Sequence, residues 1–330
     1  MKCFLGVDIG GSKSHALVAD ETGRVMGFGQ AGCGNWETVG YDGLGHVLRA
    51  ITQQALTAAG ISIAQLDGAG FGIAGYDWPS EYRPHMEAIR SLGVTCPIGL
   101  VNDALIGLLA GAEEGWGIAV VAGTGCNCWG LDRQGQTGRI TGEGPLFGEE
   151  GGAGSLVRRA IGAISRQWSQ RGPATNLTAA FLESKRVSDA FSLLEGLALQ
   201  KIALDAEDVR TVFKVASEGD GIAQAIVEWG GKQLADLAGG VVHQLGFEGE
   251  AFEMVLVGSL WKSGPRLRDA FSREVQKIAP KVRFVQLPVP PVVGGVILGM
   301  QQAGVRNPVI RQKLFDSLST PRFIGTLAGS

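Results

Sequence analysis

The fold is decided by the stretch Cys3-Phe4-Leu5-Gly6-Val7-Asp8-Ile9-Gly10-Gly11-Ser12-Lys13. Its apolar part predicts a strand over Phe4–Ile9, and the two glycines predict a tight turn into a second strand, Ser14–Asp20. Such a turn leaves backbone N–H groups free to face an anion, directly after the acidic strand end at Asp8. Taken alone, the same pattern also fits an ordinary β-hairpin with a surface Asp. Its position in the chain is needed to distinguish a phosphate loop from such a hairpin.

An equivalent glycine hairpin opens the second half of the chain. Strand Ile118–Ala122 is followed by Gly123-Thr124-Gly125 and by another strand, Asn127–Asp132. Because the two hairpins stand at matching points of two similar halves, they favour a phosphate group held between two facing domains.

The remaining elements continue this alternation of strands and helices. After the first hairpin we expect strand Val25–Gly29, helix Tyr41–Ala59, strand Ala69–Ile73, helix Glu81–Ser91, strand Ile98–Val101 and helix Ala104–Ala112. After the second we expect strand Gly138–Thr141, a mainly helical region over 153–245, strands Met254–Val257 and Val282–Val285, and helices Pro265–Ile278 and Val293–Ala303. The pattern predicts an α/β protein with two duplicated domains. The first domain would comprise residues 1–113 and 293–330, and the second would comprise residues 114–292, including the helical insertion. The tail after Gly304 has no predicted role.

Composition and charge exclude several classes of function. The 330 residues are 45% hydrophobic and 18% charged, which is typical of a globular chain. With 29 basic and 32 acidic residues, the net charge is −3 without runs of like charge, so neither a nucleic-acid footprint nor a polybasic membrane patch is indicated.

No apolar stretch reaches the roughly 18 residues of a membrane helix, and Asp8 interrupts the first apolar run, so we expect a cytoplasmic protein without a signal peptide. Five cysteines without CxxC spacing indicate neither a disulfide framework nor a zinc ribbon.

Asn102-Asp103 stands where a predicted strand ends and a helix begins. The carboxyl end of a parallel strand is where α/β proteins place ligands, so Asp103 is a candidate general base. Its structural alternative is helix N-cap, and the two roles can coexist. A hydroxyl acceptor that attacks a γ-phosphate needs little more than such a base, Mg²⁺ and positioning.

A glycine-rich turn over 142–152 carries Glu143, Glu149 and Glu150 just before the long helical region. Acidic residues before a helix are ordinary partners of its dipole. Paired carboxylates could indicate glycoside hydrolysis, but Glu149 and Glu150 are adjacent and should point apart. Binding of sugar hydroxyls is therefore the favoured functional interpretation.

Two further segments are weaker candidates for ligand contacts, and one motif matches a dinucleotide-binding pattern only superficially. The small residues of 257–264 would let adenine or ribose approach the backbone, although an ordinary turn fits equally well. Asn35-Trp36 lies in a predicted loop and could contact a sugar only if that loop faces the cleft. Residues 70–75 match GxGxxG, but the motif overlaps a strand and Pro79 follows, so a dinucleotide site is disfavoured. The four histidines show no metal-ligand spacing, so any metal should arrive with a nucleotide.

Taken together, these motifs resemble the acetate and sugar kinase, heat-shock chaperone and actin superfamily, and within it the N-acetylglucosamine kinases of the BadF/BadG/BcrA/BcrD ATPase family. The resemblance covers nearly the whole chain and rests on three ordered motifs: residues 8–13 resemble the first phosphate loop, 123–128 the second and 257–263 the adenosine segment. The resemblance implies two ribonuclease-H-like domains with ATP and Mg²⁺ in the cleft between them. It also implies a homodimeric kinase that converts N-acetylglucosamine to its 6-phosphate.

The resemblance further implies roles for individual residues. Asp103 would be the catalytic base, and Asp8 would hold Mg²⁺ through water. ATP would be bound by Gly10, Gly11, Ser12, Lys13, Gly123, Thr124, Gly125, Ala216, Gly258 and Ser259. The sugar would be bound by Asn35, Trp36, Asn102, Asp103, Cys126, Asn127, Gly144 and Glu149.

The sugar segment departs from the family pattern and leaves the acceptor open. Where the family commonly has Gly-Trp-Gly and Gly-Asp-Glu-Gly, this chain has Glu143 in the first triplet and Glu149 in the second, and Cys126 replaces the usual Ser. The added carboxylate could favour a cationic amine, so glucosamine or another hexosamine stays an alternative. Two other classes also remain: a nucleotide-switched module without an acceptor, and an ATPase activator with a shared iron–sulfur cluster. The activator is disfavoured because Cys126 and Cys128 lie too close together within the phosphate loop.

Overall fold

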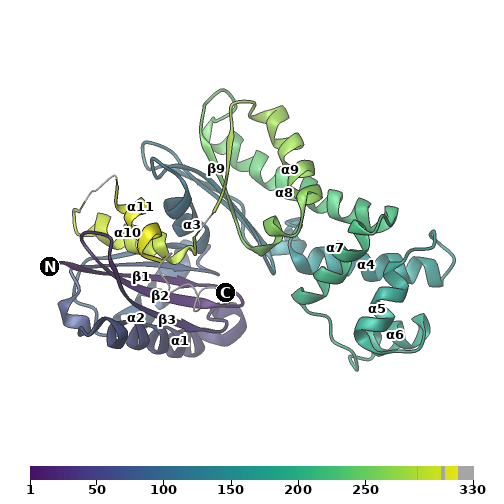
Figure 1. Cartoon of the computed structure of the whole chain (residues 1–330), viewed down its shortest axis with the longest axis horizontal. Coiled ribbons are helices and arrows are strands. Elements are labelled where there is room, and N and C mark those ends of the chain that lie inside the picture. Colours follow the sequence, from purple (N-terminus) through teal and green to yellow (C-terminus); the bar gives the residue numbers. More distant parts are fainter. Residues whose placement is uncertain (288, 306–308, 319–330) are drawn as a thin grey trace.

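A computed structural model describes residues 1–287, 289–305 and 309–318, and the chain forms two lobes, each built on its own sheet (Figure 1). The sheet of the first lobe has the order β3-β2-β1-β4-β5. Its strands are β1 Cys3–Ile9, β2 Ser14–Asp20, β3 Val25–Ala31, β4 Gly68–Ile73 and β5 Ile98–Asn102. The first three strands are antiparallel, whereas β4 and β5 run parallel to β1. The antiparallel opening predicted from the sequence is confirmed.

The second sheet repeats the first strand for strand. It has the order β10-β9-β6-β7-β8, with β6, β7 and β8 antiparallel and with β9 and β10 parallel to β6. Its strands are β6 Gly117–Ala122, β7 Cys126–Leu131, β8 Thr137–Arg139, β9 Glu253–Val257 and β10 Arg283–Gln286. The predicted duplication and α/β class are therefore confirmed.

Helices cover the first sheet on both faces. They are α1 Trp36–Ala59, α2 Tyr82–Arg90, α3 Asp103–Gly111, α10 Val292–Gln302 and α11 Ile310–Leu318, with short 3₁₀ turns at Ile63–Gln65 and Pro79–Glu81. Helix α1 begins earlier than the predicted Tyr41 because Asn35 caps it, and the non-helical Gly40 (φ 70°) then kinks the chain. The GxGxxG match falls within and just after β4, as predicted, and no dinucleotide-binding turn follows.

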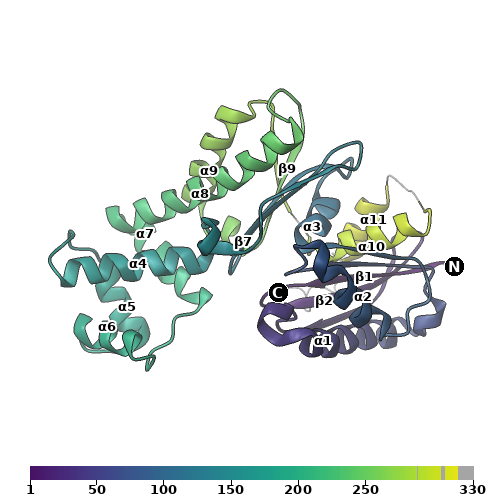
Figure 2. The same ribbon diagram turned by 180° about the vertical axis from the view of Figure 1, so that it is seen from behind.

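The helical region of the second lobe extends away from the first lobe (Figures 1 and 2). Its helices are α4 Ala153–Trp168, α5 Leu177–Lys185, α6 Ala190–Ala198, α7 Val209–Ser217, α8 Gly221–Leu245 and α9 Pro265–Ile278, with 3₁₀ turns at Gly144–Phe147, Ala206–Asp208 and Ser259–Lys262. Buried residues of α4, α5, α7 and α8 form one apolar core with the second sheet. The insertion is thus part of this lobe.

The chain passes between the sheets twice, over 112–116 and over 287–291. After the second passage, α10 packs on the first sheet, where a Cβ on Gly6 or Gly70 would collide with the backbone of α10. Glycine at these two positions therefore allows close helix–sheet contact. We retain 1–113 with 293–330, and 114–292, as the proposed domains because their boundaries fall near the two passages.

Helix α11 accounts for part of the tail that the sequence left without a role. Buried Ile310, Leu314 and Leu318 join a core with strands and helices of both lobes, and the Val25 N–H donates to Ser317 Oγ at 2.9 Å. Residues 306–308 and 319–330 of the proposed first domain lie outside the described residues. Over the described part of the chain, no helix is long and apolar enough to cross a membrane.

Candidate functional site

The two glycine hairpins meet. Each is closed by a backbone hydrogen bond, from the Gly10 N–H to the Lys13 carbonyl at 3.0 Å and from the Gly123 N–H to the Gly125 carbonyl at 2.9 Å. The Ser12 and Thr124 hydroxyls lie 2.8 Å apart and share a hydrogen bond across the lobes. The structure thus brings together the two segments that the sequence predicted to face one another.

Helix α4 starts at the second hairpin. The Ala153 N–H donates to the Gly123 carbonyl at 2.9 Å, and the Gly154 N–H donates to the Thr124 carbonyl at 3.2 Å. The positive end of α4 therefore lies beside Thr124, where an anionic group would be stabilised. A cavity of about 740 Å³ extends from the two hydroxyls along this helix, and its lining is Ser12, Thr124, Gly154, Val157, Arg158, Ile161 and residues 204–207.

Asp8 and Asp103 lie at the same edge of the first sheet. Asp8 is buried in β1, and Asp103 is the first residue of α3, directly after β5. Asn102 takes the N-cap position, since its Oδ1 accepts the Ala104 N–H at 2.9 Å. The N-cap alternative for Asp103 is therefore wrong, because Asn102 has the extended backbone that a cap requires and Asp103 is already helical.

The Asp103 carboxyl has an unusually high pKa. Burial is the main cause, and the negative charges of Asp8 and Asp77 add to it, raising the pKa to about 8. The backbone N–H groups at the start of α3 act in the opposite direction. A carboxyl with this pKa can take a proton from a hydroxyl near neutral pH and hold it.

Asp77 completes this acidic cluster and was missed by the sequence analysis. Its Oδ1 accepts Nδ2 hydrogens from Asn102 of the first lobe and Asn127 of the second, both at 3.2 Å. Burial raises the pKa of Asp77 to about 6, while the Asn127 hydrogen bond lowers it. A signal was present in the sequence, because Asp77 follows the carboxyl end of β4, which lies between β1 and β5, shortly after the GxGxxG match.

Glu149 is buried and organises the glycine-rich turn. Its Oε1 accepts the Thr141 N–H at 2.6 Å and the Thr141 hydroxyl at 2.8 Å, and its Oε2 accepts the Gly144 N–H at 3.2 Å. The neighbouring Glu150 instead pairs with Arg158 at 3.2 Å. The two adjacent carboxylates have different partners, as the sequence predicted. Glu149 thus positions Gly144, and its lone pairs are largely used by the protein.

Asn35 and Trp36 are committed to local structure. Asn35 Oδ1 accepts the Glu37 N–H at 3.0 Å, and Asn35 Nδ2 donates to Glu37 Oε2 at 2.9 Å. The Trp36 indole donates to the Gly75 carbonyl at 2.5 Å, and its ring stacks on Tyr41 at 4.7 Å. The indole N–H of Trp36 is therefore used within the protein, which leaves the ring edge for any ligand.

Trp78 is the tryptophan that links the lobes. Its indole donates to Glu143 Oε1 at 2.6 Å, and the Arg139 guanidinium lies 4.5 Å from its ring centre. Arg139 also lies 5.2 Å from the ring of Trp129. Glu143 was predicted as a candidate from its glycine-rich turn, but its partners were not, because Trp78 and Glu143 are far apart in the chain.

The predicted adenosine segment lies beside α7. Ala216 lines a cavity of about 420 Å³ together with Ser263 and Gly264, and its remaining lining is Phe213, Ser217, Gln224, Val227, Glu228, Pro265, Arg266, Asp269 and Arg273. Gly258 (φ 109°) and Ser259 precede this lining, and a Cβ on Gly258 would collide with the Ala122 backbone. Two segments that are distant in the sequence are thus brought to one cavity.

The two cysteines of the second hairpin strand are protonated thiols. Burial raises the pKa of Cys126 to about 12 and raises the pKa of Cys128 further. Both are free of disulfides. Within the described residues there is no group of three or more His, Cys, Asp or Glu side chains that could hold a metal ion.

Comparisons with known proteins give a family for this chain and two curated kinases that are similar to it. The profile of the BadF/BadG/BcrA/BcrD ATPase family matches residues 5–299. The chain is 27% identical over 305 residues to the N-acetylmuramic acid/N-acetylglucosamine kinase of Clostridium acetobutylicum, covering 92% of this chain and 99% of that protein. It is 25% identical over 311 residues to the N-acetyl-D-glucosamine kinase of Dictyostelium discoideum, covering 90% and 97%. A crystal structure from Chromobacterium violaceum, described as a candidate N-acetylglucosamine kinase, has a TM-score of 0.68 at 21% identity, covering 90% of this chain and 99% of that one.

Proposed function

The chain belongs to the BadF/BadG/BcrA/BcrD ATPase family, and we propose that it is an ATP-dependent kinase that phosphorylates N-acetylglucosamine on its 6-hydroxyl. The observation that carries this proposal is the environment of the Asp103 carboxyl. Its pKa is about 8, it is not the N-cap of α3, and the negative charges of Asp8 and Asp77 act on it. The Ser12 and Thr124 hydroxyls, which lie together, would hydrogen-bond phosphate, and the Asn102 and Asn127 amides would hydrogen-bond sugar hydroxyls.

The proposed mechanism needs one proton transfer and accurate positioning. Asp103, in its ionised form, accepts the proton of the sugar hydroxyl as that oxygen attacks the γ-phosphorus of ATP, and ADP leaves. The hairpin N–H groups and the start of α4 stabilise the negative charge on the transferring phosphoryl group. Approach of the lobes excludes water from the cleft and so limits hydrolysis of ATP.

Asp8 is the residue that fits Mg²⁺. Its carboxylate is buried and interacts electrostatically with Asp103, and His15 Nδ1 lies 3.8 Å from Asp8 Oδ2. Carboxylate oxygens are the ligands that Mg²⁺ prefers, and this ion keeps several waters when it binds. We propose that Asp8 holds the ion through water, where its charge would offset the repulsion between neighbouring carboxylates and phosphate.

The remaining predicted contacts stand as proposals with defined places in the structure. ATP would contact Gly10, Gly11, Ser12, Lys13, Gly123, Thr124, Gly125, Ala216, Gly258 and Ser259. The sugar would contact Asn35, Trp36, Asn102, Cys126, Asn127, Gly144 and Glu149, to which we add Asp77. A homodimer and a cytoplasmic location are also proposals, since they rest on the family resemblance and the composition.

A neutral acylated sugar is favoured over a free amine. The Glu143 carboxylate accepts the Trp78 indole N–H at 2.6 Å, and Trp78 also lies under the Arg139 guanidinium, so one carboxylate oxygen is already used within the protein. N-acetylglucosamine and N-acetylmuramic acid, the sugars in the name of the Clostridium relative, are therefore the first candidates. Glucosamine remains the alternative acceptor.

The test is ADP release with Mg-ATP and each of N-acetylglucosamine, N-acetylmuramic acid, glucosamine, N-acetylmannosamine, glucose or no acceptor. We expect strong stimulation by one N-acetylated sugar and weak stimulation by glucosamine. Hydrolysis that is indifferent to every sugar would contradict a kinase and favour an ATPase module. A preference for glucosamine would contradict the role assigned to the Glu143–Trp78 contact.

A further inference from the structure

Helix α3 carries Asp103 at its first residue and ends at the passage between the lobes. It is almost wholly apolar, with buried leucine, isoleucine, alanine and glycine residues, and no basic residue occupies its last turn. The helix is wedged between α10 and the second sheet, because Gly107 faces Val257 and Gly294 approaches the Ile106 carbonyl. Apolar packing of this kind buries the helix without directional contacts, so hydrogen bonds at its end add a directional restraint.

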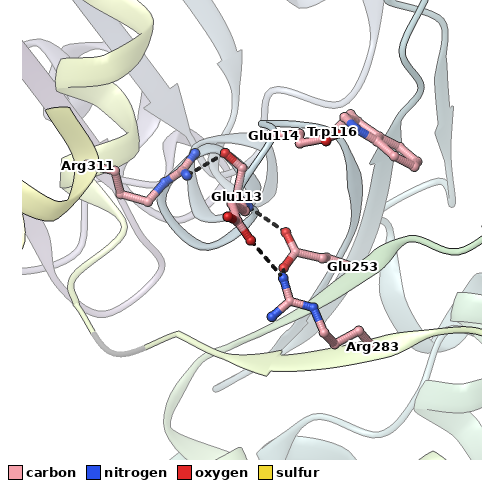
Figure 3. A network of polar contacts seen from close by, with 6 residues as sticks. All are labelled: Glu113, Glu114, Trp116, Glu253, Arg283 and Arg311. Carbon is pink, nitrogen blue, oxygen red and sulfur yellow. Dashed lines mark hydrogen bonds and ion pairs between the residues drawn. The ribbon is translucent and has the colours of Figure 1, made fainter. Parts of the chain in front are cut away.

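One carbonyl in the last turn of α3 is bound from outside the helix. Arg311 of α11 donates from Nε and Nη2 to the Leu109 carbonyl at 3.2 and 3.0 Å. Its Nη1 donates to the Glu113 carbonyl at 2.7 Å (Figure 3). The last four carbonyls of a helix have no partner within it, and a cation there also complements the helix dipole. One guanidinium thus holds both the end of α3 and the start of the passage.

Arg311 itself stands on a fixed base. Ile310, Leu314 and Leu318 bury the apolar face of α11, and Ser317 accepts the Val25 N–H of the first sheet. Arg311 therefore connects the helix that carries the proposed base to a part of the first lobe that packing holds in place.

The same passage is tied to the second lobe. The Glu113 N–H donates to Glu253 Oε2 at 2.5 Å, and the Glu113 carboxylate pairs with Arg283 at 3.3 Å (Figure 3). Glu253 and Arg283 form an ion pair with each other and are register partners at the start of β9 and β10. The network is therefore continuous from α11, through residues 109–113, to the second sheet.

We propose that Arg311 is a positioning residue for Asp103, which it serves by anchoring the far end of α3. The nine residues of α3 span about 13 Å, so a guanidinium at one end can set the axial position of a carboxyl at the other. This inference rests on the proposed kinase function for its kinetic consequences. Its structural content, that Arg311 restrains α3 and the passage, is independent of the reaction.

The kinetic test is Arg311→Ala in the full-length protein. Because an error of about 1 Å in a reacting group can cost about 10²-fold in rate, we expect kcat to fall about 10–100-fold while KM for ATP changes less than about threefold. Millimolar methylguanidine should restore part of kcat by occupying the vacated position, and Arg311→Lys should be intermediate. Unchanged kcat in Arg311→Ala would overturn the proposal.

A matched control separates positioning from the integrity of α11. Gln312→Ala removes an exposed neighbour whose side-chain amide donates to Asp316, so it should leave kcat unchanged. Leu314→Ala should lower Tm through lost packing, with a smaller loss of kcat than Arg311→Ala at a temperature where both variants are folded. A loss of kcat in Leu314→Ala equal to that in Arg311→Ala would overturn a specific role for the guanidinium.

Hydrogen exchange distinguishes failure of this inference from failure of the proposed function. In Arg311→Ala without ligands, amides of residues 106–116 should exchange faster than in the wild type, while those of α1 should not change. If no sugar stimulates the wild type but this local change appears, the kinase proposal fails and the anchor stands. Unchanged exchange over 106–116 overturns the anchor, and if Arg311→Ala does not fold, Arg311→Lys and Gln312→Ala provide the same comparison.

Discussion

The proposed sugar half and the proposed nucleotide half of the site are built differently. On the sugar side, Asp77, Asn102 and Glu149 are buried and already hydrogen-bonded. On the nucleotide side, the Ser12–Thr124 contact is exposed, and cavities of about 740 and 420 Å³ extend from the hairpins and beside Ala216. One half is ordered by the protein, whereas the other offers open volume.

This difference follows from the charge of the two proposed ligands, a neutral sugar and an anionic nucleotide. A neutral sugar must be recognised by directional hydrogen bonds, so preorganised amides and carboxylates lower the cost of binding. A nucleotide carries several negative charges of its own, and backbone N–H groups, a helix terminus and Mg²⁺ can hold those charges after it arrives. Because Asp103 is proposed to act between the two ligands, we expect changes in the two halves to have separable effects.

The largest effect is expected for Asp103→Asn, which removes the base and leaves both halves in place. We expect kcat to fall about 10²–10⁴-fold, the usual contribution of a general base, with little change in the affinity for ATP. In the wild type, kcat/KM should rise with pH through about 8, because Asp103 acts only after it loses its proton. Steady-state kinetics over pH 5.5–9.5 and calorimetric titration with an ATP analogue measure both. Near-normal turnover in Asp103→Asn would remove this carboxyl from the mechanism.

The same variant should be more stable than the wild type at alkaline pH. A folded-state pKa of about 8 means that, between about pH 4 and 8, the folded protein holds a proton that the unfolded chain has released. This carboxyl therefore lowers the free energy of unfolding as pH rises over that range, and Asn removes the penalty. Tm of Asp103→Asn should exceed that of the wild type by a few degrees at pH 8 and match it near pH 4. A lower Tm for Asp103→Asn than for the wild type at pH 8 would show that the ionised Asp103 carboxylate stabilises the folded protein rather than destabilising it.

The next effect is expected for Asp77→Ala, which breaks the sugar half alone. It removes the acceptor of the half-buried Asn127 amide, and the loss of one such hydrogen bond costs about 0.5–1.5 kcal/mol. We expect KM for the sugar to rise about 10–100-fold and KM for ATP to stay within about twofold, since the amides lose their orientation. Asp77→Asn, which keeps an acceptor oxygen, is the matched control and should lose less. Equal increases in the two KM values would contradict the separation of the halves.

The smallest effect is expected for Ser12→Ala and Thr124→Ala, which alter the nucleotide half. Their shared hydrogen bond is exposed, so Tm should change by less than about 1 °C in either variant. We expect KM for ATP to rise about 3–10-fold and KM for the sugar to stay constant, because each hydroxyl would contribute one hydrogen bond to phosphate. A rise in the sugar KM instead would mean that the hairpins also order the sugar side.

Local sequence signals predicted the frame of the site and some of its residues. The hairpin strands, the strand before Asp103 and helix Pro265–Ile278 were predicted because apolar runs between glycines and proline carry strong local signals. Asp77 and Trp78 were missed because their importance comes from Asn127 and Glu143, which lie in the other lobe. Trp36 was predicted as a sugar contact, but only the folded chain shows that the Gly75 carbonyl uses its indole N–H.

The sequence by itself determined the two glycine hairpins, the duplicated order of strands and helices, and Asp103 at the end of a strand. Each of these depends on interactions between residues close in the chain, which leave a readable pattern. The tertiary structure alone decided that Asp8, Asp77 and Asp103 share one environment, and that Arg311 reaches the end of α3. Those features depend on contacts between segments far apart in the chain, and the pKa of a carboxyl or the partner of a helix end is set by such contacts.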